Sequence, residues 1–134
     1  MKKLMLIITA FICGCTSFKH PDIAQSKTVA EALIQKENSG DYAGTAQYYT
    51  DDFNKSEPLA ARTEKFQKLH DALGDYVNAE CVKSTDSTDL NDFPSVYLQY
   101  RVKHSKLTSL ENFMVIREGG SLKVELHNIM QAVQ

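Results

Sequence analysis

Apolar residues recur at helical spacing in the first half of the chain. Between Asp22 and Ser39, one helix face is marked by Ile23, Val29, Ala30, Leu33 and Ile34. Ser39-Gly40-Asp41 is expected to end this helix and to cap a second one, from Tyr42 to about Thr50. A third helix is predicted from Glu57-Pro58 to Gly74, because proline in the first turn of a helix loses no hydrogen bond. Its predicted buried positions are Leu59, Phe66, Leu69 and Leu73.

After Gly74 the apolar positions alternate, which indicates strands rather than helices. Strands are expected at residues 76–82, 93–104, 107–118 and 121–130, with a polar loop at 83–92. In the second strand Val96, Leu98, Tyr100 and Val102 share a face. Gly119-Gly120 predicts a two-residue hairpin loop between the last two strands, because glycine adopts positive φ readily.

The hairpin predicts a register in which Glu118 lies opposite Ser121. The face turned toward the helices then carries Phe113, Val115, Leu122, Val124 and Leu126. The opposite face carries Leu110, Met114, Ile116 and Ile129 among Lys123, Glu125 and His127. This face is too apolar to be plain solvated surface, so those four apolar residues are predicted to form an interface, for instance in a homodimer. A single β-bulge would exchange the faces.

The N-terminus has the pattern of a secretory signal. Met1-Lys2-Lys3 is positively charged, and the apolar run from Leu4 to Ile12 is interrupted only by Thr9. The run is too short to span a bilayer, which takes roughly 20 apolar residues.

Ile12-Cys13-Gly14-Cys15 resembles the bacterial lipobox, in which a small residue precedes the lipid-bearing cysteine. The resemblance implies cleavage after Gly14, a diacylglycerol thioether on Cys15 and an acylated N-terminus; one acyl chain gives only reversible membrane binding, whereas two or three make a lasting anchor. An ordinary secretory signal is the alternative. Thr16 in place of aspartate resembles the outer-membrane sorting pattern, facing the periplasm, if the envelope is Gram-negative. We therefore expect a signal peptide at 1–14, a lipidated N-terminus and tether at 15–21, and one domain at 22–134.

Composition supports a single soluble domain and limits its partners. The chain has 134 residues, of which 43% are hydrophobic and 24% charged. Removing the first fourteen residues deletes Lys2 and Lys3 and leaves 13 basic against 17 acidic residues, a net charge of −4. A nucleic-acid partner is not expected, because phosphate binding needs a concentrated basic face. Cys81 is then the lone cysteine of the domain and is interpreted as a small buried residue, with a reactive or metal-binding thiol as the alternative.

The order of three helices and a bent antiparallel sheet is similar to the nuclear transport factor 2-like (cystatin-like cone) superfamily. The resemblance covers about 24–129 and includes the helix start Gly40-Asp41-Tyr42 and the closing segment Glu118-Gly119-Gly120-Ser121-Leu122-Lys123-Val124. Leu122 stands where a typical member has tryptophan. The resemblance implies an α+β fold of three N-terminal helices on a curved antiparallel sheet of about four strands, an open cone end that can hold a small hydrophobic molecule, and dimers through the outer sheet face. Members include isomerases, dehydratases and non-catalytic binding modules, so the fold does not choose the function.

An isomerase-type site would need a carboxylate base and a phenol at the cone mouth. On the predicted register Glu111 and Asn128 face inward as a pair, and Tyr100 points the same way. The alternative interpretation is a polar rim, with Tyr100 as a core aromatic residue. Asp51-Asp52 is interpreted as a turn rather than a catalytic carboxylate pair, and the sequence has no nucleophile elbow or phosphate loop.

Histidines and tyrosines are the remaining candidates. His20, His70, His104 and His127 do not pair at metal-ligand spacing, so no metal site and no cofactor are predicted. His70 lies one turn from Phe66 and would border a pocket or be solvated. Aromatic residues on a helix over a cone would line an apolar pocket, which makes Tyr48, Tyr49, Tyr100 and Asn128 the predicted ligand-binding residues; core packing explains the tyrosines equally well.

The sequence therefore favours a lipid-anchored envelope protein whose domain binds a small apolar ligand or a partner protein without catalysis. A small isomerase or hydrolase-like enzyme using Glu111 and Tyr100 is the first alternative. An accessory subunit that docks on an envelope complex is the second.

Overall fold

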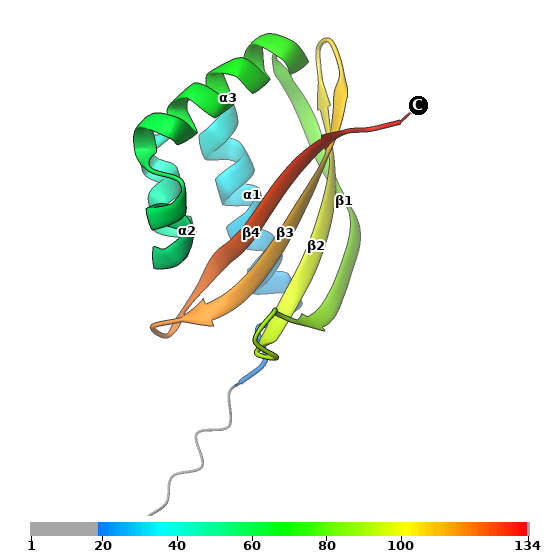
Figure 1. The fold of residues 1–134 in the computed structure, drawn as a ribbon. Helices are drawn as coiled ribbons and strands as arrows, with labels where there is room; N and C mark the ends of the chain where they lie inside the picture. Colours follow the sequence, from blue (N-terminus) through cyan, green and yellow to red (C-terminus); the bar gives the residue numbers. More distant parts are fainter. Residues whose placement is uncertain (1–18, 134) are drawn as a thin grey trace, which may run out of the picture.

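The computed structural model describes residues 19–133, so the predicted signal peptide and Cys15 lie outside the described part. In chain order the elements are α1 (Ile23–Asn38), the 3₁₀ helix η1 (Ala43–Tyr48), α2 (Asp51–Ser56), α3 (Leu59–Leu73), β1 (Tyr76–Thr88), β2 (Pro94–His104), β3 (Thr108–Glu118) and β4 (Ser121–Gln131). The strands form one antiparallel sheet in the order β1-β2-β3-β4. Figure 1 shows the helices gathered on one face of this sheet, which curves around them. The predicted architecture is confirmed.

Helix α1 begins where the sequence predicts, because Asp22 caps it. The Asp22 carboxylate accepts a hydrogen bond from the backbone N–H of Gln25 at 2.8 Å. The buried face of the helix consists of Ser26, Ala30, Leu33, Ile34 and Glu37. Glu37 thus continues the apolar stripe by one turn, and its carboxylate enters the core.

The segment after α1 differs from the predicted single helix at 42–50. It forms η1, and Tyr49 then leaves the helix and pairs with Val124 in an isolated β-bridge. Helix α2 begins directly afterward because the Thr50 hydroxyl accepts a hydrogen bond from the backbone N–H of Phe53 at 3.2 Å. Asp51 and Asp52 are therefore not turn residues; they form the first turn of α2, where negative charge suits the helix dipole.

Helix α3 ends at Gly74 as predicted, but its first buried residue is a charged one. Leu59 is 47% exposed, contrary to the prediction, and Arg62 takes the buried position one turn later with 1% exposure. The Arg62 guanidinium donates hydrogen bonds to Thr45 in η1 at 3.2 Å and to Asn54 in α2 at 2.8 Å. It also lies 4.6 Å from the ring centroid of Tyr49. Arg62 therefore joins three helices through polar contacts that an apolar pattern does not reveal.

Strand β1 is longer than predicted, because residues 83–88 pair with β2 instead of forming a loop. β1 is an edge strand of the sheet, where polar side chains face water and backbone pairing alone extends the strand. The loop is confined to the residues after Thr88. There the Asp89 carboxylate accepts hydrogen bonds from the backbone N–H groups of Asn91 and Phe93, both at 2.8 Å.

The hairpin between β3 and β4 starts in the predicted register, with Glu118 opposite Ser121 and Val115 opposite Val124. A β-bulge then intervenes, so that Met114 pairs with Leu126 and Glu125 is the extra residue. Beyond it every residue of β4 faces the side opposite to the predicted one. His127 and Ile129 turn inward, whereas Leu126 and Asn128 turn outward.

The core lies between α1 and the concave face of the sheet. Its fully buried members include Leu33, Tyr49, Leu98, Tyr100 and Phe113. The predicted inward face of β2 is confirmed. No helix within residues 19–133 is long and apolar enough to cross a bilayer.

Candidate functional site

Three elements bring two carboxylates and an imidazole together inside the core. Glu37 comes from the last turn of α1, Glu111 from β3 and His127 from β4 beyond the bulge. One imidazole nitrogen, Nε2, lies 3.0 Å from Oε2 of Glu111, and the other, Nδ1, lies 3.3 Å from Oε1 of Glu37. All three residues are at least 92% buried. We call these residues the Glu–His–Glu cluster.

Tyr49 completes the hydrogen bonding on the Glu37 side. Its hydroxyl donates to Oε1 of Glu37 at 3.0 Å and lies 2.8 Å from Nδ1 of His127. The His127 ring stacks on Phe113, with ring centroids 4.4 Å apart. A protonated imidazole satisfies every contact, because it donates from Nε2 to Glu111 and from Nδ1 toward Tyr49 and Glu37.

The cluster shifts the proton affinities of its members. Burial opposes the charged form of His127, but the charge of Glu37 and the hydrogen bond to Glu111 outweigh it and raise the pKa of His127 to about 9. Burial raises the pKa of Glu37, although His127 acts in the opposite direction. Burial, followed by the charge of Glu37, raises the pKa of Tyr49, which is a neutral phenol and serves as a hydrogen-bond donor.

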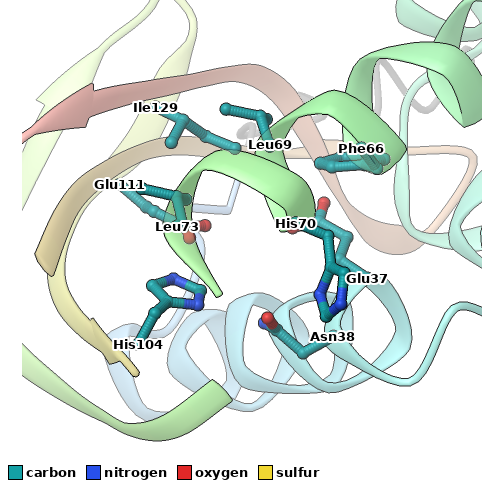
Figure 2. Close-up of a pocket in the computed structure, with 9 residues that line it drawn as sticks. All are labelled: Glu37, Asn38, Phe66, Leu69, His70, Leu73, His104, Glu111 and Ile129. Atoms are coloured by element: carbon teal, nitrogen blue, oxygen red, sulfur yellow. The ribbon is translucent and has the colours of Figure 1, made fainter. Parts of the chain in front are cut away.

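A small cavity of about 30 Å³ lies next to the cluster. Figure 2 shows its side chains around the C-terminal end of α3. We call it the mouth pocket; its lining residues are Glu37, Asn38, Phe66, Leu69, His70, Leu73, His104, Glu111 and Ile129. The volume holds a water molecule or an ion, and a larger guest must move side chains of α3. The mouth pocket combines apolar walls with a polar floor.

Some polar atoms at this pocket have no hydrogen-bond partner in the described part of the chain. The cluster engages Oε1 of Glu37 and Oε2 of Glu111, and no group within residues 19–133 donates a hydrogen bond to the other oxygen of either carboxylate. Nδ1 of His104 is buried and also lacks a partner in this part of the chain. Burial lowers the pKa of His104, although Glu111 and the Gly74 backbone act in the opposite direction, so the ring is neutral near pH 7.

The predicted catalytic pair is not assembled. Glu111 and Tyr100 both face inward from adjacent strands, as predicted, and are opposite each other in the register. The Tyr100 hydroxyl, however, donates to Glu31 of α1 at 3.0 Å, and Glu111 accepts from His127. Burial and then the Glu31 hydrogen bond raise the pKa of Tyr100. The two side chains therefore serve different contacts, and only Glu111 lines the mouth pocket.

The predicted ligand-binding set is also divided. Tyr49 supports the cluster from the core, and Tyr48 packs against the core while partly exposed. The sequence predicts that Asn128 faces inward, but the bulge places it on the outer face, exposed and paired with Asn112. None of the predicted set, which also includes Tyr100, lines the mouth pocket.

Three of the four residues predicted to form the outer interface lie on the outer face of the sheet. Leu110, Met114 and Ile116 are half-buried on the outer side of the sheet, as the register predicts. Ile129 is predicted to lie with them, but it lines the mouth pocket because it lies beyond the bulge. His127, predicted on the outer face, is in the core for the same reason.

Glu37 and His104 are not among the site residues predicted from the sequence, although their positions in the periodic pattern indicate that they are buried. Glu37 lies three residues after Ile34 and four after Leu33, on the buried stripe of α1, so the helical period could have identified it. His104 lies two residues after Val102 on the inward face of β2, where strand alternation places it. His127 carries no such signal, since the bulge at Glu125 has no sequence mark such as glycine.

Comparison with known proteins identifies the fold. No protein-family model matches the chain, and no curated protein matches it by sequence. Two similar solved structures are ActVI-ORFA from Streptomyces coelicolor and Aln2 from another Streptomyces strain. ActVI-ORFA has a TM-score of 0.55 and 15% identity over 81% of this chain and 93% of that one. Aln2 has a TM-score of 0.54 and 11% identity over 84% of this chain and 94% of that one.

The chain has the nuclear transport factor 2-like fold. At this level of identity the comparison concerns the fold alone. In the nuclear transport factor 2-like cone of this chain, the mouth pocket lies at the end where α3 terminates.

Proposed function

We propose that the protein is a lipid-anchored protein of the bacterial cell envelope whose cone binds a small ligand at the mouth pocket without catalysis. The anchor is supported by the sequence Ile12-Cys13-Gly14-Cys15 after a short apolar run. Ligand binding is supported by one observation above all. Carboxylate oxygens of Glu37 and Glu111 that have no hydrogen-bond donor among residues 19–133 lie at a cavity whose walls are apolar.

The lining defines the chemistry of the ligand. The walls formed by Phe66, Leu69, Leu73 and Ile129 favour an apolar body. The floor offers acceptor oxygens from Glu37 and Glu111, which favour a hydrogen-bond donor or a cation. We therefore refine the expected ligand from purely apolar to a small molecule with an apolar body and a donating or cationic group.

Native mass spectrometry of the full chain, purified in mild detergent with no ligand added, tests this proposal. We expect an additional small mass that is lost on denaturation. Leu69→Trp should remove it, because the larger ring fills the mouth pocket from α3. Leu59→Trp is the matched control, since Leu59 lies on the same helix and is 47% exposed. A wild-type chain without any retained mass contradicts ligand binding.

One observation supports the alternative that the protein docks on a partner protein instead of binding a ligand. The interior of the cone is nearly filled, and a protein that only docks needs no cavity. Leu110, Met114 and Ile116 would then supply the contact surface on the outer face of the sheet. A ligand-free native mass at a dimeric value, reduced to the monomer by Met114→Lys, is the result expected from a homodimer through that face.

A further inference from the structure

The Glu–His–Glu cluster holds two buried carboxyl groups but one imidazole as their nearby cationic partner. No lysine or arginine within residues 19–133 lies within ion-pair distance of Glu37 or Glu111. Buried carboxylates without full compensation are costly, and such groups are normally paired or bound to a metal.

The donor atoms are already close enough for one ion. Glu37, Glu111 and His127 each place a possible ligand atom within 4.8 Å of the other two. Carboxylate oxygen with imidazole nitrogen is a donor set typical of zinc and other first-row divalent ions. The fixed hydrogen bonds of His127 are also typical, because a ligating imidazole usually donates its second N–H to a carboxylate or another acceptor. Here Tyr49 and Glu37 lie on that second side.

A second, independent observation lies at the same place. His104 is 92% buried, yet its Nδ1 has no hydrogen-bond partner among the described residues. His104 lines the mouth pocket together with Glu37 and Glu111, as Figure 2 shows. The pocket volume of about 30 Å³ suits an ion with a water molecule.

We propose that the Glu–His–Glu cluster, beside the mouth pocket, binds one divalent first-row transition metal ion through Glu37, Glu111 and His127, with a water molecule in the pocket joining the ion to His104. A divalent ion supplies positive charge beside the two carboxyl groups, and its water molecule gives the unpaired nitrogen of His104 a partner. Magnesium and calcium fit less well, because they prefer sites made wholly of oxygen. The proposal rests on the proposed function in one respect, since it names what the polar floor of the mouth pocket would hold.

Equilibrium dialysis against Zn²⁺ with elemental analysis tests this site. The full chain, carrying no polyhistidine tag, is treated with EDTA and desalted before dialysis. We expect one Zn²⁺ per chain and at least about a tenfold loss of affinity in Glu111→Gln and in His104→Gln, a magnitude that loss of even an outer partner of a metal site produces. His20→Gln and Cys81→Ser are the controls and should bind as the wild type does, because both residues lie outside the mouth pocket.

A spectrum of the Co²⁺-loaded wild-type chain keeps the test independent of whether the variants fold. Nitrogen and oxygen ligands give visible d–d bands without a sulfur-to-metal charge-transfer band. Absence of Zn²⁺ binding by the wild type, unchanged affinity in a folded Glu111→Gln, or a sulfur charge-transfer band would each overturn the proposal.

The two proposals fail separately. A chain that retains a small organic molecule in native mass spectrometry but binds no Zn²⁺ overturns only the metal site. A chain that binds Zn²⁺ but retains no organic molecule keeps the metal site and overturns the binding of a larger ligand.

Discussion

His127 lies between two carboxylates in the core, so its proton contributes to the stability of the fold. Its pKa is about 9 in the folded chain, against an ordinary value of 6.5. A raised pKa means that the folded state binds the proton more tightly, so this stability is fully present below pH 6.5 and is lost as the pH rises through 9. The raised pKa of Glu37 acts in the same direction but begins at lower pH.

We expect the free energy of unfolding to fall by about 3 kcal/mol between pH 6.5 and 9.5 in urea titrations with EDTA present. His127→Gln should flatten this dependence, whereas the exposed control His20→Gln should keep it. Equal slopes in the wild type and in His127→Gln would show that the cluster does not hold the proton.

At the same scale, the sequence predicts some site residues and not others. The inward direction of Glu111 follows from counting back along β3 from the hairpin, where the strand is regular. The position of His127 could not be predicted in the same way, because it depends on where the bulge falls. The pairing of Glu37 with Tyr49 joins α1 to a β-bridge, and a local pattern carries no information on such a contact.

At the scale of elements, Gly74 ends α3 in a conformation that only glycine adopts easily. Its φ is +86° and its ψ is −167°, and an added Cβ would lie 2.2 Å from the Ser105 hydroxyl oxygen. Gly40 also has positive φ, at +78°, but a Cβ there would meet nothing within 4 Å. An alanine at Gly40 would therefore introduce backbone strain alone, whereas an alanine at Gly74 would introduce backbone strain and a steric clash.

Gly74→Ala should lower the free energy of unfolding by about 3 kcal/mol, and Gly40→Ala by about 1 kcal/mol, because only the first adds a clash to the strain. Thermal or urea unfolding of the two variants measures the difference. Ser105→Ala combined with Gly74→Ala should recover part of the loss. Equal losses at the two glycines would mean that the turn after α3 can shift to accept a side chain.

The sequence predicts the elements with strong periodicity well, and those governed by single contacts poorly. Helices α1 and α3 follow from their apolar stripes and end signals, and the last hairpin follows from Gly119-Gly120. The separation of η1 from α2 depends on the Thr50 cap and on the bridge at Tyr49. The extension of β1 depends on backbone pairing with β2. The polar side chains of residues 83–88 do not indicate this pairing.

At the scale of the whole molecule, the mouth pocket and the proposed anchor belong to different parts of the chain. Figure 1 shows the described chain entering the domain at the end of the sheet that carries the β1–β2 loop and the hairpin between β3 and β4. The mouth pocket lies where α3 ends, on the strand segments remote from that hairpin. An anchor at the N-terminus would therefore leave the mouth pocket directed away from the membrane surface.

The anchor itself is tested by the two neighbouring cysteines. Cys15 follows Gly14 and is the expected lipid carrier, whereas Cys13 occupies the variable position of the motif. We expect Cys15→Ser to lose incorporated radiolabelled fatty acid and to retain the uncleaved signal, while Cys13→Ser keeps both lipid and cleavage. Because two or three acyl chains bind a membrane nearly irreversibly, only Cys15→Ser should also change the response of the chain to detergent-free extraction. Lipid retained in Cys15→Ser would assign the anchor to another residue, and lipid absent from the wild type would leave an ordinary secretory signal.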